Sequence, residues 1–116
     1  MFVILPADYQ IDYYSEEVEE QILALPDTLA ARYVVLTRRM TVVGANLGPP
    51  HTDSFGDGLF ELRLKGAEGI ARVFFCTLIG RRVMMLHSFI KKTQKTPARE
   101  IEVARKRMKE VKHANS

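Results

Sequence analysis

Two arginines and a histidine occupy positions that three predicted strands would bring onto one face of a sheet. If the first hairpin turns through Gly66–Gly69, Arg63 lies opposite Arg72. If the second hairpin turns at Ile79–Gly80, Arg72 lies opposite His87. Because cross-strand neighbours share a face, this register predicts one row of Arg63, Arg72 and His87.

Such a row, beside Lys91, Lys92 and Lys95, suits chemistry on a phosphodiester. Arginine stays protonated and can hold two phosphate oxygens at once, and histidine, with an ordinary pKa of about 6.5, can exchange a proton near neutral pH. Cleavage of RNA without a metal needs a group that removes the 2′-hydroxyl proton, charge that stabilises the transition state, and a proton for the leaving 5′ oxygen. The catalytic candidates are Arg63, Arg72, His87 and Lys92, with no metal and no cofactor.

Each member of the row also has a structural interpretation. Arg63 could pair with Glu61, two residues away on its own face, or with Glu68. His87 could be a half-buried structural histidine, and the lysines that follow it could be ordinary charges at the end of a strand. The residues alone leave both interpretations open.

Four further residues are interpreted as structural. His51 lies in a Pro-rich loop and is predicted to be a surface residue, whereas Cys76 is predicted to pack in the core or at an edge. Met84 and Met85 are also predicted to pack. One cysteine and three scattered histidines predict no metal site.

The opposite face of the sheet is predicted to be apolar and to pack against helices. A one-residue slip would mix apolar and polar positions, so the clean separation supports the register. The predicted apolar set is Phe60, Leu62, Leu64, Val73, Phe75, Met84 and Leu86.

Two helices are predicted before these strands. Ser15 stands where an N-cap belongs, and the helix that follows should end near Leu25. Pro26 opens the second helix, which Gly44 ends. The second helix carries an apolar stripe of Leu29, Tyr33, Leu36, Met40 and Val43, so the two helices should form an antiparallel hairpin.

The remaining pattern predicts an α+β fold in a single domain over residues 1–116. A first strand is predicted at Tyr9–Tyr14, and the Gly- and Pro-rich segment Ala45–Gly58 is predicted to be a loop. The three later strands are predicted at 59–65, 70–77 and 82–90, and the last helix at Pro97 to about Lys112. The narrow apolar stripe of that helix is Ile101, Ala104, Met108 and Val111.

Charge divides the chain unevenly. Residues 1–80 hold 6 Lys and Arg against 11 Asp and Glu, whereas residues 81–116 hold 11 against 3. A segment this basic is suited to a polyanion, and RNA is the first candidate, although a solvated basic helix without a ligand would look the same. The candidates for RNA or ribosome binding are Lys91, Lys95, Arg99, Arg105, Lys106 and Lys109.

Composition also restricts location. No apolar run approaches the length of a membrane span, and Met1–Leu5 is too short for the hydrophobic region of a signal peptide. A single cysteine cannot form an internal disulfide, so the cytoplasm is the expected compartment.

The segment from Leu25 to Lys109 resembles the phage-derived Gp49-like branch of HigB toxins in the RelE/ParE superfamily. The resemblance rests on Gly58–Arg63, which reads GLFELR, and on His87–Pro97, which reads HSFIKKTQKTP. Leu47–Pro50 and the helix from Ala98 through Arg107 match in order and spacing.

This resemblance implies a RelE-like fold, with a helical hairpin packed on a mostly antiparallel sheet and a C-terminal helix. It also implies a toxin of a type II toxin–antitoxin system that cleaves messenger RNA on the ribosome, and a HigA-like helix-turn-helix antitoxin through which the complex binds operator DNA. By position, the family site would comprise Arg63, Arg72, His87, Lys91, Lys92 and Lys95.

The chain departs from the superfamily in its tyrosines. Several members use a tyrosine near the C-terminus in catalysis, but here the tyrosines are at 9, 13, 14 and 33. Histidine or lysine would then transfer protons, unless this branch needs no tyrosine. The alternative function is a ParE-like inhibitor of DNA gyrase that acts by contact, since a fold does not determine a function.

Overall fold

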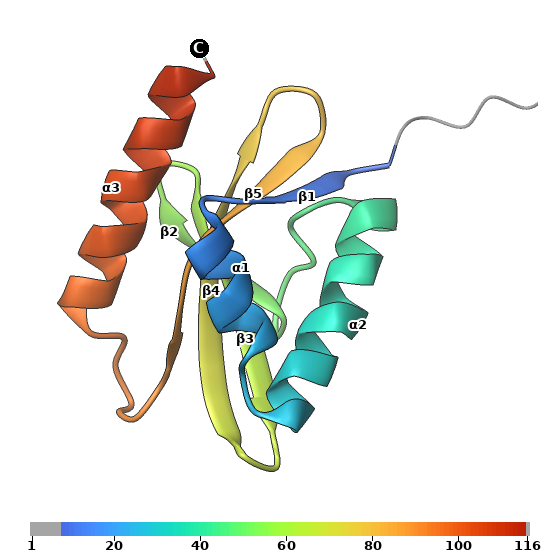
Figure 1. The fold of residues 1–116 in the computed structure, drawn as a ribbon, viewed down its shortest axis with the longest axis vertical. Helices are drawn as coiled ribbons and strands as arrows, with labels where there is room; N and C mark the ends of the chain where they lie inside the picture. Colours follow the sequence, from blue (N-terminus) through green and yellow to red (C-terminus); the bar gives the residue numbers. More distant parts are fainter. Residues whose placement is uncertain (1–7, 116) are drawn as a thin grey trace, which may run out of the picture.

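A computed structural model describes residues 8–115, so the run Met1–Leu5 lies outside the described part. The elements are β1 (Gln10–Tyr13), α1 (Glu16–Leu23), α2 (Asp27–Val43), β2 (Thr52–Gly56), β3 (Leu59–Gly66), β4 (Gly69–Leu78), β5 (Arg82–Ile90) and α3 (Ala98–Ala114) (Figure 1). Within this range, no helix is both long enough and apolar enough to cross a bilayer.

One sheet with the strand order β1-β5-β4-β3-β2 lies between helices. The β1–β5 pair is parallel, and the other neighbouring pairs are antiparallel. Helices α1 and α2 run in roughly opposite directions and pack on one face, and α3 packs on the other (Figure 1). The predicted α+β architecture is therefore confirmed.

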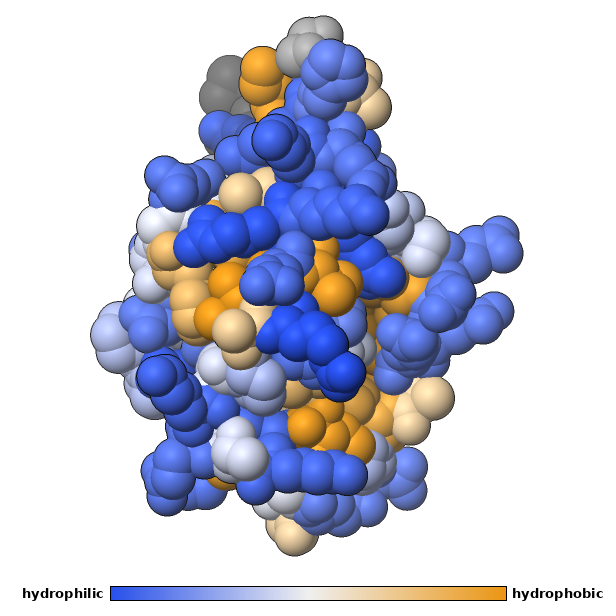
Figure 2. Space-filling model, turned by 90° about the vertical axis from the view of Figure 1, so that its left-hand side faces the viewer, coloured by the Kyte–Doolittle hydropathy of each residue, from blue (hydrophilic) through white to orange (hydrophobic). Residues whose placement is uncertain are grey.

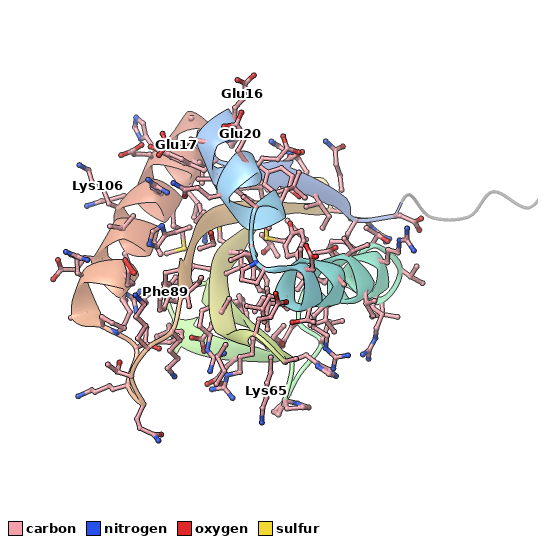
Figure 3. All side chains as sticks on the ribbon, turned by 60° about the horizontal axis from the view of Figure 1, so that its bottom comes forward. Glu16, Glu17, Glu20, Lys65, Phe89 and Lys106 are labelled. Atoms are coloured by element: carbon pink, nitrogen blue, oxygen red, sulfur yellow. The ribbon has the colours of Figure 1, made fainter. Side chains whose placement is uncertain are left out.

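Helix α1 begins as the sequence predicts. The Ser15 hydroxyl accepts a hydrogen bond from the Val18 amide at 3.2 Å and satisfies one of the free amides of the first turn. Val18 and Ile22 are buried on the sheet side of the helix. The acidic side chains of Glu16, Glu17 and Glu20 lie at the other surface of α1, as Figure 3 shows.

The first turn of helix α2 is capped by a side chain from the β3–β4 turn. Its N-cap residue, Pro26, offers no side-chain acceptor, and the Glu68 carboxylate accepts the Thr28 amide at 2.7 Å. That hydrogen bond lowers the pKa of Glu68. Most of the predicted apolar stripe is buried, but Val43 is 69% exposed, so its assignment to the stripe was wrong. Val43 is the last residue of the helix, beyond the part that the sheet covers.

Gly66 stands where the β3–β4 hairpin meets the start of α2. A Cβ atom added there would lie 2.9 Å from the Thr28 Cβ and would also collide with the Thr28 hydroxyl. We therefore expect Gly66→Ala to lower the free energy of unfolding by about 1–3 kcal/mol, as overpacking typically does. Urea denaturation measures this loss. The double variant Gly66→Ala/Thr28→Ser should not recover stability, because serine keeps the Oγ atom that the new Cβ would meet. The double variant Gly66→Ala/Thr28→Gly should recover it, because glycine removes both contacting atoms.

The first predicted cross-strand pair is confirmed, and the second is wrong. Arg63 lies opposite Arg72, but Arg72 lies opposite Phe89, and His87 lies opposite Phe74. The observed register of β5 on β4 differs from the predicted register by two residues, and two separate features contribute one residue each. The turn holds three residues between Leu78 and Arg82, and a β-bulge interrupts the ladder after Phe74.

Because the two offsets sum to two residues, Arg72 and His87 still share a face, as diagonal neighbours. The first half of β5, however, presents the opposite side from that predicted. Met84 and Leu86 pack in the cluster beneath α3, so their assignment to the α1–α2 face was wrong. Val83 and Met85 occupy that face instead.

The segment predicted as one loop contains a strand. Within Ala45–Gly58, β2 runs from Thr52 to Gly56 and pairs with β3. The Gly and Pro residues that favoured a loop flank this short edge strand or end it. Thr52 is buried, and its hydroxyl donates to Asn46 Oδ1 at 2.8 Å, which anchors the strand to the preceding loop.

Candidate active site

A cationic groove lies at the end of the sheet where the β3–β4 hairpin approaches the segment after β5. It consists of two adjoining hollows that share Ile70 and Arg72. The first hollow, of about 540 Å³, is lined by Ile70, Arg72, Lys91, Lys92, Thr93 and Gln94. The second, of about 230 Å³, is lined by Arg32, Pro50, His51, Arg63, Lys65, Ile70 and Arg72. No acidic side chain of the described chain lines either hollow, so the groove favours an anion.

Arg72 lies where the two hollows meet. Its side chain is 11% exposed, and its Nη1 donates to the carbonyl of Ala71 at 3.2 Å. Its Nε lies 3.2 Å from Glu61 Oε1, as an ion pair without the alignment of a hydrogen bond. Burial lowers the pKa of Arg72, and the nearby Glu61 carboxylate opposes that shift. These contacts hold a cation in a defined position at the centre of the groove.

Glu61 provides a buried carboxylate beneath both arginines. Its side chain is 2% exposed, and its Oε2 accepts from Arg63 Nε at 3.3 Å. The Thr96 hydroxyl donates to Oε1 at 3.4 Å, which connects the carboxylate to the segment before α3. The structural alternative in which Arg63 pairs with Glu61 is confirmed, and no pairing of Arg63 with Glu68 is found among residues 8–115. Arg63 also reaches Asp53 Oδ2 at 3.0 Å.

The lysines after β5 owe their position to one additional backbone hydrogen bond. The Lys91 amide donates to the Ile70 carbonyl at 2.8 Å, so pairing with β4 continues one residue beyond the strand. Lys91 and Lys92 then line the first hollow. Among residues 8–115, no carboxylate forms an ion pair with either lysine. Both charges therefore remain available to a ligand.

The family model described as "Phage derived protein Gp49-like (DUF891)" matches residues 20–109. This range includes every residue that lines the two hollows. The chain belongs to the Gp49-like family. This is a family of RelE/HigB-like toxins associated with toxin–antitoxin systems. A comparison with curated proteins found no match.

His87 lies outside the groove of this Gp49-like protein. Its side chain is 14% exposed, its Nε2 lies 3.1 Å from Glu100 Oε1, and its ring stacks on Phe89 beneath α3. Its Nδ1 is buried without a hydrogen-bond partner among the described residues. Figure 3 shows Phe89 between the sheet and α3. Of the three side chains in the predicted row, Arg63 and Arg72 therefore line the groove, whereas His87 lies beside it under α3.

A substitution distinguishes a structural His87 from a catalytic one. Glutamine can still approach Glu100 but cannot exchange a proton near neutral pH. Because His87 Nε2 is engaged by Glu100, any RNA cleavage at this groove is expected to fall by less than about 10-fold in His87→Gln, well below the 100- to 10,000-fold contribution of a general acid or base. Single-turnover cleavage measures this. If the cleavage rate fell by about 100-fold or more while the unfolding midpoint stayed the same, His87 would have to act directly in proton transfer.

The basic residues of α3 divide into two groups. Arg105 donates to the Phe55 carbonyl at 2.8 Å, and Arg107 donates to the Leu86 carbonyl at 2.8 Å, so both help to dock the helix. Lys106 points away from the body of the molecule in Figure 3, and Lys109 is also exposed. Hydrophilic side chains cover most of this side of the molecule (Figure 2). Lys95 and Arg99, near the start of α3, are exposed as well.

Three cationic or titratable residues of the groove were missed by sequence reasoning. Arg32 comes from α2, Lys65 from β3, and His51 from the segment before β2, where it is half-buried and not simply on the surface. The alternation of β3 places Lys65 on the face of Arg63, which was an available indication. Arg32 and His51 reach the groove only through tertiary packing, so no local pattern indicated them.

The other chemically reactive side chains have structural surroundings. Cys76 is buried, and burial raises the pKa of its thiol to about 11, which confirms the prediction that it packs. Tyr13 of β1 and Tyr33 of α2 share a hydrogen bond of 2.8 Å, and Tyr14 contacts Glu110 of α3. No tyrosine lines either hollow. Among residues 8–115, no three potential metal ligands lie together.

Proposed function

We propose that this Gp49-like protein is the toxin of a type II toxin–antitoxin system and an endoribonuclease that cleaves messenger RNA on the translating ribosome. The observation that supports this proposal is the groove, in which Arg72, Lys91 and Lys92 meet without a lining carboxylate. A phosphodiester backbone is the natural ligand for such a surface. Cleavage in the cytoplasm would inhibit translation.

The proposed reaction proceeds by attack of the 2′-oxygen on the adjacent phosphorus. The 2′-hydroxyl loses its proton to water in the groove, the new phosphorus–oxygen bond forms, and the bond to the 5′ oxygen breaks. Arg72 and Arg63 hold the phosphate oxygens and stabilise the additional negative charge. Lys92 donates its proton to the leaving 5′ oxygen, so the products are a 2′,3′-cyclic phosphate and a 5′-hydroxyl.

We assign binding of ribosomal RNA to the exposed cations at the start and along the outer side of α3. These are Lys95, Arg99, Lys106 and Lys109, together with Lys91 at the groove. Arg105 is engaged with β2, so its contribution to RNA binding would require exchange of that contact. The proposed partner that restrains the toxin is a HigA-like antitoxin, which would also carry the complex to operator DNA.

Binding through phosphates makes affinity depend on salt. Each neutralised phosphate releases a counterion, so affinity falls linearly with the logarithm of salt concentration. We expect the affinity for purified ribosomes to fall by about 10-fold or more between 50 and 200 mM salt. Co-sedimentation with ribosomes measures it. Equal affinity at both concentrations would contradict the phosphate-contact account.

Primer extension on a defined message tests the function directly. We expect cleavage when the message is bound to purified ribosomes, and none on naked RNA. The outer-face variant Arg39→Ala, exposed on α2 away from the groove, should cleave like the wild type. If the protein arrests growth but cleaves no message, a contact inhibitor of the ParE type would replace the nuclease.

A further inference from the structure

We propose that the second hollow of the groove is a subsite for one nucleotide of a single-stranded RNA. The base would stack against His51, and the phosphate would lie between Arg32 and Lys65. This inference rests on the proposed RNA-cleaving function and adds a specificity pocket to it. The reacting phosphate would lie where the two hollows meet, against Arg72 and Arg63, and the second hollow would hold the nucleotide next to it.

The wall that carries His51 is already in place without a ligand. The His51 amide donates to the Gly48 carbonyl at 2.9 Å, and the His51 carbonyl accepts from the Arg63 amide at 2.8 Å. The Thr52 hydroxyl, buried at 1% exposure, accepts from the Gly48 amide at 2.8 Å. The backbone on both sides of His51 is therefore attached to β3 and to its own loop. A preformed wall lowers the entropy lost on binding.

The lining of the second hollow combines two kinds of surface. Pro50, His51 and Ile70 provide ring and aliphatic surfaces, which suit the flat face of a base. RNA-binding proteins stack unpaired bases on aromatic side chains, and histidine is one of those they use. A hollow for a bare anion would not need such surfaces, so this lining favours a nucleotide over inorganic phosphate.

The charge of the hollow comes mainly from two cations without a carboxylate partner. Arg63 is held by Glu61 and Asp53, which offset its charge. In residues 8–115, no carboxylate forms an ion pair with Arg32 or Lys65, and both side chains are exposed. Lys65 extends from the end of the sheet in Figure 3. These two cations are therefore available to hold a phosphate.

The shared lining makes the two hollows one path. Ile70 and Arg72 line both hollows, so the hollows adjoin there, and a strand bound at Arg72 would reach the second hollow next. A base in a duplex is paired and stacked, and its face is not free to meet His51. The geometry therefore points to a single-stranded ligand, with specificity for the base read on one side of the cleaved bond.

Nuclear magnetic resonance titration with two probes tests the subsite. We expect 5′-AMP to shift the signals of His51 and Ile70, and inorganic phosphate to shift Arg72 without His51. His51→Ala should weaken AMP binding about 5-fold or more, in line with the loss of one base-stacking contact, whereas His51→Phe should retain it. Arg32→Ala should weaken binding too, and Arg39→Ala, on the same helix but outside the groove, should not.

Two results would overturn the subsite. One is an equal response of His51 to phosphate and to AMP, which would make the hollow a plain anion site. The other is message cleavage by His51→Ala at the wild-type rate and at the wild-type sequence positions. Failure of the nuclease is distinguishable, because a wild type that shifts His51 with AMP but cleaves no message would retain the subsite and lose the proposed activity.

Discussion

Arg72→Ala is expected to lower the single-turnover rate of message cleavage on ribosomes by about 100-fold or more. Removing one group that stabilises transition-state charge typically costs this much. The effect should be large because Arg72 alone among the arginines lines both hollows, and because Glu61 and Ala71 hold it in place. Ribosome binding should fall much less, since α3 retains its exposed cations.

Arg72→Lys provides the matched control. Lysine keeps the positive charge but cannot hold two phosphate oxygens in a planar grip, so we expect an intermediate rate. It also keeps a cation beside the buried Glu61, which protects the fold if alanine disturbs it. Full cleavage by both variants would remove Arg72 from the reaction, and the groove would then be an ordinary charged surface.

Glu61→Ala is expected to lower both the stability and the activity of the protein. Removing one partner of a buried ion pair typically costs about 3–5 kcal/mol, because the remaining charge stays buried without compensation. Here the remaining charge is Arg72, which is 11% exposed. Cleavage should fall about 10- to 100-fold even in the folded fraction, because a displaced Arg72 no longer meets the phosphate correctly. Urea denaturation and cleavage rates measure the two effects.

Asp53 offers the comparison for Glu61, since both carboxylates pair with Arg63. The Asp53 side chain is 54% exposed, and an exposed ion pair contributes about 0–1 kcal/mol. Asp53→Ala should therefore change stability little. The double variant Glu61→Leu/Arg72→Met should recover stability but not cleavage. If Glu61→Ala were as stable and as active as Asp53→Ala, the anchoring role of Glu61 would be wrong.

The elements of the fold could be predicted from local pattern because their causes are local. Ser15, the break at Pro26 and the alternation of β3 each act within a few residues, and each prediction is confirmed. The bulge in β5 could not be predicted in this way. It depends on how the strand packs beneath α3, where Leu86 and His87 both face the helix side.

The candidate site could be predicted only where residues lie on neighbouring strands. The pairing of Arg63 with Arg72 followed from one hairpin turn, and the two arginines do line the groove. Glu61 was noticed as a partner of Arg63, but its burial and its contact with Arg72 were not foreseen. Arg32 lies on α2, and His51 directly precedes β2, a strand that the sequence analysis did not predict, so only the folded structure brings them to the groove.

The bulge at Leu86 has a consequence for how the gene can change. Leu86 and His87 are consecutive residues that both face α3, so the alternation of side chains between the two faces of the sheet is interrupted there. Even-numbered positions face α3 before this point, and odd-numbered positions face α3 after it. A codon lost at Leu86 would therefore leave the side chains of Ser88 and Phe89 on their present sides. The same loss at Met84 would turn the start of the strand over and bring Arg82 to the buried position of Val83. A one-residue loss in β5 therefore keeps the sidedness of the rest of the strand only at the bulge, and at Leu86 it removes a fully buried side chain from the cluster beneath α3.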